Sequence, residues 1–171
     1  MPESILSSAD YSYEELVDRI SQTYAVGRQR AVRAVNTLIT ETYWQIGHDI
    51  VEYEQGGKVK AEYGQALLTR LSRDLTRLHG RGFSRSNLVY MRLFYLRYPI
   101  GQKPSDLLSW SHYVELLKID DELERSFYQQ QARLEHWSVP ELRRQIQSAL
   151  FLRLAAGKDK ATILRLAAHG Q

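Results

Sequence analysis

Apolar residues recur at steps of three and four positions along most of this 171-residue chain. This spacing places them on one face of an α-helix, whereas no segment shows the sustained alternation of apolar and polar residues that indicates a strand. The longest series predicts a helix that ends near Gly56 and Gly57: Val32, Val35, Ile39, Tyr43, Ile46, Ile50 and Tyr53. The chain is therefore predicted to be all-α, a multi-helix bundle of about seven helices.

A turn containing two glycines separates two of the predicted helices. The first helix stops at Gly80 and Gly82, and its apolar face is formed by four leucines: Leu67, Leu71, Leu75 and Leu78. Ser84 is a good N-cap for the second helix, and Pro99 indicates its end. Two helices joined by a short glycine turn are the plan of a helix-turn-helix, whose second helix enters the DNA major groove. We therefore expect a helix-turn-helix-like unit within the bundle.

Further helix boundaries follow from capping residues. Asp120 can cap a helix through the following segment, and Ser138 to Glu141 forms the pattern of a capping box, with Pro140 tolerated in the first turn. Loops are expected near residues 55–61 and 99–108. We predict a single helical domain over residues 1–156, followed by residues 157–171 as a weak last helix or a linker.

Positive charge is concentrated on the predicted helix-turn-helix. Residues 63–99 contain seven arginines but only one acidic residue, Asp74. The candidate nucleic-acid-binding residues are Arg70, Arg73, Arg77, Arg81, Ser84, Arg85, Ser86, Asn87 and Tyr90. They follow the edge of the first helix, the turn and the first part of the second helix. The expected partner is DNA, because a basic first turn on such a helix suits a groove lined by phosphates.

These residues are expected to have different roles. An arginine stripe along the first helix and Arg81 in the turn suit phosphate groups, whereas Arg85 can bond guanine bidentately and Asn87 can bond adenine. A narrow strip of the second helix that includes Tyr90 and Arg97 is expected to face a ligand. Arg92 lies among apolar neighbours and is expected to form a structural ion pair, with Glu122 or Glu124 as the partner.

Each of these features also has a simpler explanation. Two helices with a glycine turn form any α-hairpin, most of which bind no nucleic acid, and a run of charge is usually a solvated surface. The tyrosines of the second helix are more often packing residues than stacking platforms. From spacing and charge alone, DNA binding and a solvated basic surface are equally supported.

Five ordered motifs distinguish the two explanations. They are "YWQIG" at 43–47, "GFSRSNLVYMRLFY" at 82–95, "LSWSH" at 108–112, "FYQQQ" at 127–131 and "WSVPELRRQI" at 137–146. Over roughly residues 12–154 the chain resembles the N-terminal domain of the YhcG family, in which a helical region precedes a domain assigned as a PDDEXK-type nuclease. The resemblance implies a DNA-binding module with a helix-turn-helix, and it implies no catalytic residue. Ser86 departs from the second basic residue that many relatives have there.

The residues themselves indicate no catalytic chemistry. A PDDEXK site needs an E-x-K pair beside a further acidic residue on adjacent strands, and the sequence contains neither an E-x-K triplet nor a predicted strand. The five histidines show no metal-ligand spacing, and His112 in "SWSH" is expected to be a hydrogen-bonded packing residue. With no cysteine, a thiolate metal site is excluded. We therefore expect no enzyme activity, no metal, no cofactor and no small-molecule substrate in this chain.

The remaining expectations concern location and partners. The acidic N-terminus lacks the apolar stretch of a signal peptide, and no apolar run is long enough for a membrane span, so a cytoplasmic protein without membrane contact is expected. A C-terminal nuclease domain or nuclease partner is expected from the resemblance. The alternative function is a protein-interaction or homodimerisation scaffold, because the helix over 28–53 has a near-heptad seam and Tyr43 and Trp44 could anchor an interface. RNA binding is a third reading.

Overall fold

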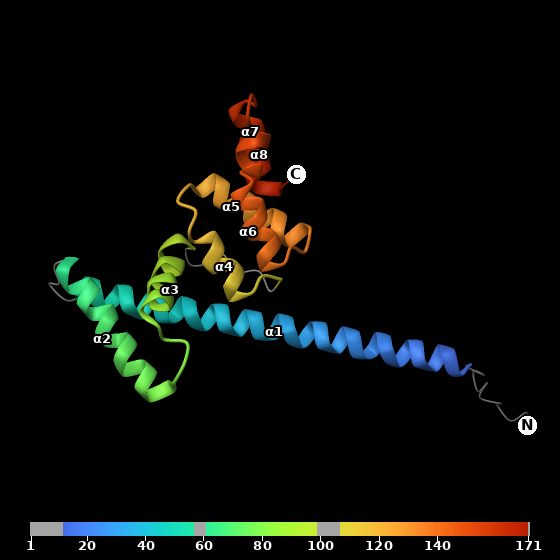
Figure 1. Ribbon diagram of the computed structural model, residues 1–171, viewed down its shortest axis with the longest axis horizontal. Coiled ribbons are helices and arrows are strands. Elements are labelled where there is room, and N and C mark those ends of the chain that lie inside the picture. Colours follow the sequence, from blue (N-terminus) through green and yellow to red (C-terminus); the bar gives the residue numbers. More distant parts are fainter. Residues whose placement is uncertain (1–11, 57–60, 99–106, 171) are drawn as a thin grey trace, which may run out of the picture. The chain divides into compact units, whose positions relative to one another are not determined.

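The computed structural model describes residues 12–56, 61–98 and 107–170, with the backbone alone for residues 61–65. Within these residues the chain forms eight helices and no strand, which confirms the all-α prediction (Figure 1). The helices are α1 (Tyr13–Gly56), α2 (Ala61–His79), α3 (Arg85–Arg97), α4 (Trp110–Leu116), α5 (Glu122–Leu134), α6 (Val139–Gln147), α7 (Leu150–Ala155) and α8 (Lys160–His169). None of the described helices is sufficiently long and apolar to cross a membrane.

The chain divides into two compact units, Met1–Val35 and Asn36–Gln171. The described part of the first unit is the beginning of α1. Its first turn is closed by reciprocal hydrogen bonds: the Ser12 N–H donates to Glu15 Oε2 at 2.8 Å, and the Glu15 N–H donates to Ser12 Oγ at 3.2 Å. This capping box satisfies donors at the start of the helix.

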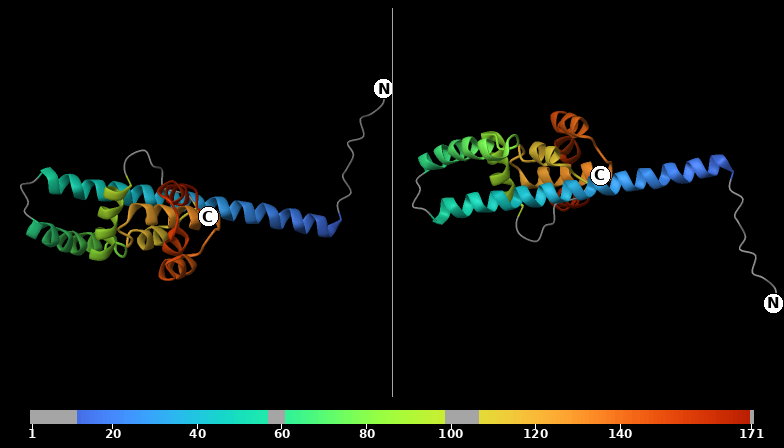
Figure 2. Two further views of the ribbon diagram at one scale, coloured as in Figure 1. Left: turned by 90° about the horizontal axis from the view of Figure 1, so that it is seen from above. Right: turned by 90° about the horizontal axis from the view of Figure 1, so that it is seen from below.

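In the second unit, the end of α1 packs with α2 and α3 around a small apolar core. Its buried residues are Ile50, Leu68, Leu88 and Met91. The views in Figure 2 show α2 running back along the end of α1, with α3 beside both. Gly47 allows α1 and α3 to approach closely, because a Cβ at this position would overlap the backbone carbonyl of Met91. A glycine is therefore required where these two helices cross.

A larger core joins the end of α3 to the remaining helices. Phe94 of α3, Tyr113 of α4, Phe127 of α5 and Leu142 of α6 are completely buried in it, and Phe151 of α7 is nearly so. Helix α8 packs against α5 and buries Ala167. Residues 160–169 of the expected tail are thus helical, and the domain boundary at residue 156 stays a prediction.

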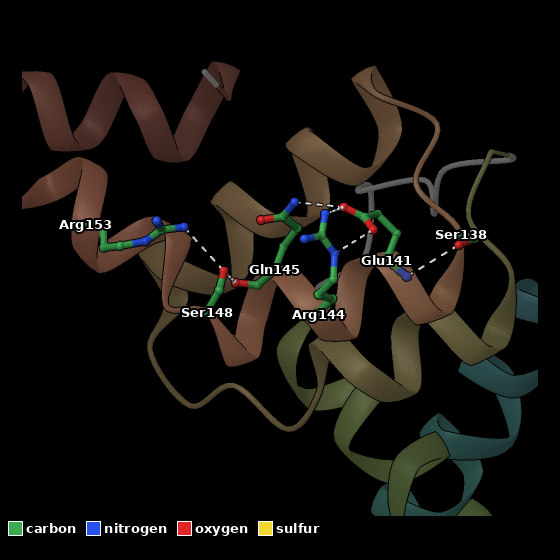
Figure 3. Close-up of polar contacts among 6 residues, drawn as sticks. All are labelled: Ser138, Glu141, Arg144, Gln145, Ser148 and Arg153. Carbon is green, nitrogen blue, oxygen red and sulfur yellow. Dashed lines mark hydrogen bonds and ion pairs between the residues drawn. The ribbon is translucent and has the colours of Figure 1, made fainter.

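Most of the described helix boundaries agree with the capping residues in the sequence. Ser84 Oγ accepts a hydrogen bond from the Asn87 N–H, and Ser138 Oγ accepts one from the Glu141 N–H, as predicted. The Glu141 carboxylate accepts hydrogen bonds from Arg144 and Gln145 (Figure 3). Of the predicted capping box, the structure therefore contains the hydrogen bond to the Ser138 hydroxyl but not the return bond to the Glu141 carboxylate. The cap of α5 is Asp121, one residue after the predicted Asp120. Pro99 and Gly57 lie outside the described residues.

The interface residues predicted on α1 contribute to the chain's own core. The Trp44 indole N–H donates to the backbone oxygen of Tyr98 at 2.8 Å, and its ring packs edge-on against Tyr95. Tyr43 packs edge-on against Trp110 with ring centroids 4.9 Å apart. Both side chains are half-buried. A second role for them at an interface stays a prediction.

Candidate nucleic-acid interface

The predicted break between α2 and α3 is confirmed. Helix α2 ends at His79, and α3 begins at Arg85. Gly80 and Gly82 between them have φ angles of 80° and 114°, a region that side chains with a Cβ rarely occupy. These two glycines let the chain reverse within a few residues. The assignment of this unit as a DNA-binding helix-turn-helix stays a prediction.

Asn87 fixes the turn in place. Its side-chain amide donates to the Gly82 backbone oxygen at 2.6 Å, while its Oδ1 accepts from the Trp110 indole N–H at 2.8 Å. One residue of α3 therefore ties the glycine turn to the start of α4. Because each end of the amide makes one of these bonds, the Asn87 side chain is held in place, and reading an adenine edge would have to use its second N–H and the second lone pair of Oδ1.

Three of the predicted arginines surround one cleft. A shallow cleft of about 570 Å³ lies between α2 and α3, and its lining includes Arg70 and Arg73 of α2 and Arg85 of α3. All three side chains are exposed. Arg85 is the first residue of α3, and the first turn of α3 contains no acidic side chain. The positive end of the helix dipole thus adds to the charge of the arginines.

The cleft carries more positive than negative charge. Asp74 is the acidic partner: its Oδ1 lies 3.1 Å from Arg73 Nε, and its Oδ2 lies 3.9 Å from Arg70 Nε. The hydrogen bond from Arg73, with the charges of Arg77 and Arg70, holds the pKa of the Asp74 carboxyl below its usual range. Since one carboxylate is shared among several arginines, the surface keeps a net positive charge at neutral pH.

The other predicted residues lie in different surroundings. Arg77, Arg81 and Ser86 are exposed and do not line the cleft, although the charge of Arg77 acts on Asp74. Ser84 is exposed too, but its hydroxyl caps α3. Tyr90 is half-buried and packs against the larger core. We use the name basic edge for Arg70, Arg73, Arg77, Arg81 and Arg85.

Two predictions for arginines outside the basic edge need correction. Arg92 does form a structural ion pair, but its partner is Glu54 of α1, at 2.7 Å, and not the acidic residues of α5. The Arg97 side chain is engaged within the chain, although the sequence predicted that it would be free. Its guanidinium donates to the backbone oxygens of Leu117 and Ile119 and pairs with Asp120, so it closes the end of α4.

Sequence reasoning missed two residues of the cleft. Ala66 and Thr69 line it together with Arg70 and Arg73. The four residues are spaced at i, i+3, i+4 and i+7, which places them on one face of α2. That spacing is present in the sequence, but an alanine and a threonine carry no charge that would point to a binding surface.

His112 has the structural role that the sequence predicts. Its Nδ1 accepts from the Ser109 backbone N–H at 3.1 Å, and its Nε2 lies 2.9 Å from the Trp137 backbone oxygen. With Nδ1 as an acceptor, the proton is on Nε2 and is donated to that oxygen. The ring therefore joins the start of α4 to the segment before α6.

Comparison with known proteins places the chain in a family. Residues 18–153 match the family described as the DUF1016 N-terminal domain. The chain belongs to this family. It is also similar to a protein of Escherichia coli strain K12 named "Putative nuclease YhcG", with 36% identity over 195 aligned residues that cover 95% of this chain and 52% of that protein. The chain thus spans about half the length of this relative. No solved structure matches it.

The segments that resemble this family hold the fold around the basic edge. Within 43–47, Trp44 and Gly47 set the contact of α1 with α3. The segment 82–95 contains the turn and most of α3, while Trp110 and His112 in 108–112 bond Asn87 and Trp137. The side chains of these motifs therefore fix how α1, α3 and α4 pack, and the segment 82–95 also contains the exposed Arg85.

Proposed function

We propose that this domain is the DNA-targeting module of a nuclease system, and that it binds DNA through the basic edge. The observation that carries the proposal is the cleft where Arg85, at the start of α3, joins Arg70 and Arg73 of α2. These side chains come from two helices and are exposed, and the carboxylate of Asp74 pairs with Arg70 and Arg73. Such a surface attracts phosphate groups, which supply most of the affinity in nonspecific DNA binding.

The proposed contact is mainly to the phosphate backbone. Arg70 and Arg73 flank the cleft as a positioning edge, and Arg81 in the turn extends it. Arg85 and Ser86 are the exposed residues of the first turn of α3 and would be the ones to reach base edges. With Asn87 held by Gly82 and Trp110, few side chains remain to read sequence. We therefore expect weak sequence preference and a strong dependence on salt.

The proposal assigns no catalysis to this chain. The relative carries the name "Putative nuclease YhcG" and is about twice as long as the matched region. We place the cutting step in a C-terminal nuclease domain or a nuclease partner, and the binding step here. A cytoplasmic location, with access to DNA, belongs to the same proposal.

The test is a fluorescence anisotropy titration against duplex DNA, single-stranded DNA and structured RNA, each at two salt concentrations. We expect duplex DNA to bind most tightly, with log affinity falling linearly with log salt. Arg85→Ala should weaken binding and reduce that slope by about 0.9. The matched control is Arg144→Ala, because Arg144 is an exposed arginine already paired with Glu141.

The outcomes separate the candidate functions. If no nucleic acid binds at either salt concentration, the proposal is wrong and the scaffold alternative gains. If structured RNA binds more tightly than duplex DNA, the proposed partner, DNA, is wrong. If duplex DNA binds and Arg85→Ala behaves as Arg144→Ala does, the basic edge is not the contact surface.

A further inference from the structure

The first half of α1 leaves its apolar side chains without cover. Every side chain from Ser12 to Val32 is exposed. Tyr13, Ile20 and Tyr24 are 80%, 59% and 72% exposed. Most of the stability of a helix in a protein comes from packing of its apolar face, and a solvated helix has no need of large apolar residues. This segment, blue in Figure 1, therefore has the properties of one half of an interface.

The exposed residues follow a coiled-coil spacing. Positions separated alternately by four and three residues form a seam of seven: Tyr13, Val17, Ile20, Tyr24, Gly27, Ala31 and Ala34. All seven are exposed. Three heptads of this kind are enough to pair two helices through their a and d positions. We name these residues the N-terminal seam.

Charge along the segment changes sign from one end to the other. Residues 14–19 contain Glu14, Glu15 and Asp18 against one arginine, whereas residues 28–33 contain three arginines and no acid. A parallel pair would place each end beside its like charge. An antiparallel pair places the acidic end of one helix beside the basic end of the other. The segment is thus its own electrostatic complement.

Side-chain size along the seam favours the same arrangement. In an antiparallel pair centred near residue 22, Tyr13 lies opposite Ala31 of the second copy, Val17 opposite Gly27, and Ile20 opposite Tyr24. Tyr13 and Val17 then meet small residues, while Ile20 and Tyr24 pack together at the centre. In a parallel pair Tyr24 would meet Tyr24, and Gly27 would meet Gly27, which alternates crowded layers with empty ones.

We propose that the N-terminal seam forms an antiparallel coiled coil with the same segment of a second copy of this chain. Glu14 and Arg28 each follow a seam residue directly, so they line the same edge of the seam. In the antiparallel pair Glu14 of one copy lies beside Arg28 of the other, and the two-fold symmetry repeats this ion pair. The interface is independent of the basic edge, which lies wholly on α2, the turn and α3.

The first test measures the mass of the 171-residue chain by analytical ultracentrifugation over a range of concentrations. We expect a reversible dimer for the wild type. Ile20→Lys, on the seam, should raise the dissociation constant at least about tenfold. The matched control is Val26→Lys, because Val26 is exposed on the same helix but lies off the seam. A wild type that stays monomeric at tens of micromolar, or equal effects of both substitutions, would overturn the proposal.

The second test determines the orientation by charge reversal. Glu14→Arg and Arg28→Glu should each weaken the dimer, and the double variant should restore it, because the swapped pair again has opposite charges. Asp18→Arg makes the same charge change away from the seam and should have a smaller effect. Circular dichroism of each variant checks that α1 remains helical. If the double variant is weaker than either single one, the antiparallel arrangement is wrong.

Discussion

The two arginine-rich regions of this chain differ in how their charge is compensated. On α6 and α7, Arg143 pairs with Glu115 at 2.7 Å, Arg144 makes two bonds to Glu141, and Arg153 donates to Ser148. Figure 3 shows that the contacts of Arg144 and Arg153 belong to one connected series of polar side chains. On α2 and α3, Arg70 and Arg73 share Asp74, and Arg85 faces the same cleft.

The difference shows that the number of arginines in a segment does not by itself identify a binding surface. Both regions are basic in the sequence, but the arginines of α6 have carboxylate partners on α4 and on α6 itself. The basic edge keeps a surplus of positive charge, because Asp74 is the carboxylate that two of its arginines share. We interpret the first region as structural and the second as functional, and the predictions below test this assignment in order of decreasing effect on stability.

The largest effect on stability is expected where α1 crosses α3. Gly47→Ala places a methyl group on the Met91 carbonyl, so α1 and α3 must move apart. We expect a loss of about 2 to 3 kcal/mol in the free energy of unfolding, measured by urea denaturation. DNA affinity per folded molecule should change little, because the arginines remain.

A matched glycine provides the control. Gly56 lies in the same helix, outside the N-terminal seam, and a Cβ added there would meet no neighbouring atom within 4 Å, so Gly56→Ala should not lower stability. Equal losses for both substitutions would show that the close crossing at Gly47 does not limit the fold.

The sequence predicted features that depend on neighbours along the chain. The break at Gly80 to Phe83, the Ser84 cap and the structural role of His112 all follow from local residue types, and the structure confirms them. Partners across the fold were harder to predict. Arg92 bonds Glu54, which lies 38 residues away, because the crossing of α1 and α3 brings them together. The sequence contains no signal for that crossing other than Gly47.

The candidate site was predicted in part for the same reason. The arginine stripe on α2 follows from helical spacing, but its meeting with Arg85 depends on how α2 and α3 pack. The engagement of Asn87 depends on Trp110, a residue of another helix. Long-range packing decides which polar residues remain available, and it cannot be read from composition.

The second prediction concerns Asn87. Asn87→Ala removes its bonds to Gly82 and Trp110 and leaves the half-buried indole N–H without a partner. We expect a loss of about 1 to 2 kcal/mol, measured by thermal or urea denaturation. Ser86→Ala, at the exposed neighbouring position, should change stability by less than about 0.5 kcal/mol. If Asn87→Ala leaves stability unchanged but alters preference among DNA sequences, Asn87 is a base-reading residue.

The third prediction uses pH to examine the compensated region. Burial would raise the pKa of Glu115, but the hydrogen bonds from Arg143 and Lys118 outweigh it and hold the pKa below its ordinary value of 4.5. The ionised carboxylate therefore stabilises the fold above pH 4.5, and this contribution is lost as the pH falls through the lowered pKa. Glu115→Gln should cost about 1 kcal/mol at pH 7.

Stability curves recorded from pH 7 down to pH 3 check this prediction. The difference between wild type and Glu115→Gln should shrink as the wild-type carboxyl takes up its proton. Glu141→Gln should have a smaller effect at pH 7, because Glu141 and Arg144 form an ion pair near the surface. A constant difference across the pH range would show that charge pairing at Glu115 does not stabilise α4 and α6.

The smallest effect on stability is expected at the basic edge itself. Arg70→Ala, Arg73→Ala and Arg85→Ala combined remove three exposed side chains, of which Arg70 and Arg73 make exposed ion pairs with Asp74. Such pairs contribute little, and removing like charges from one cleft relieves repulsion. We expect Tm to change by less than about 2 °C, while the slope of log DNA affinity against log salt falls by about 2.7.

The corresponding triple variant of Arg143, Arg144 and Arg153 should show the reverse. It removes one of the two cations bonded to the buried Glu115, so Tm should fall, while the salt slope should stay close to the wild-type value. Differential scanning calorimetry and the salt titration measure both quantities on the same preparations. If the two triple variants lose DNA binding equally with unchanged Tm, both regions contact DNA and compensation by carboxylates does not distinguish them. If Tm falls for the basic-edge variant instead, its arginines stabilise the fold, and the positive charge of α2 and α3 has a structural role.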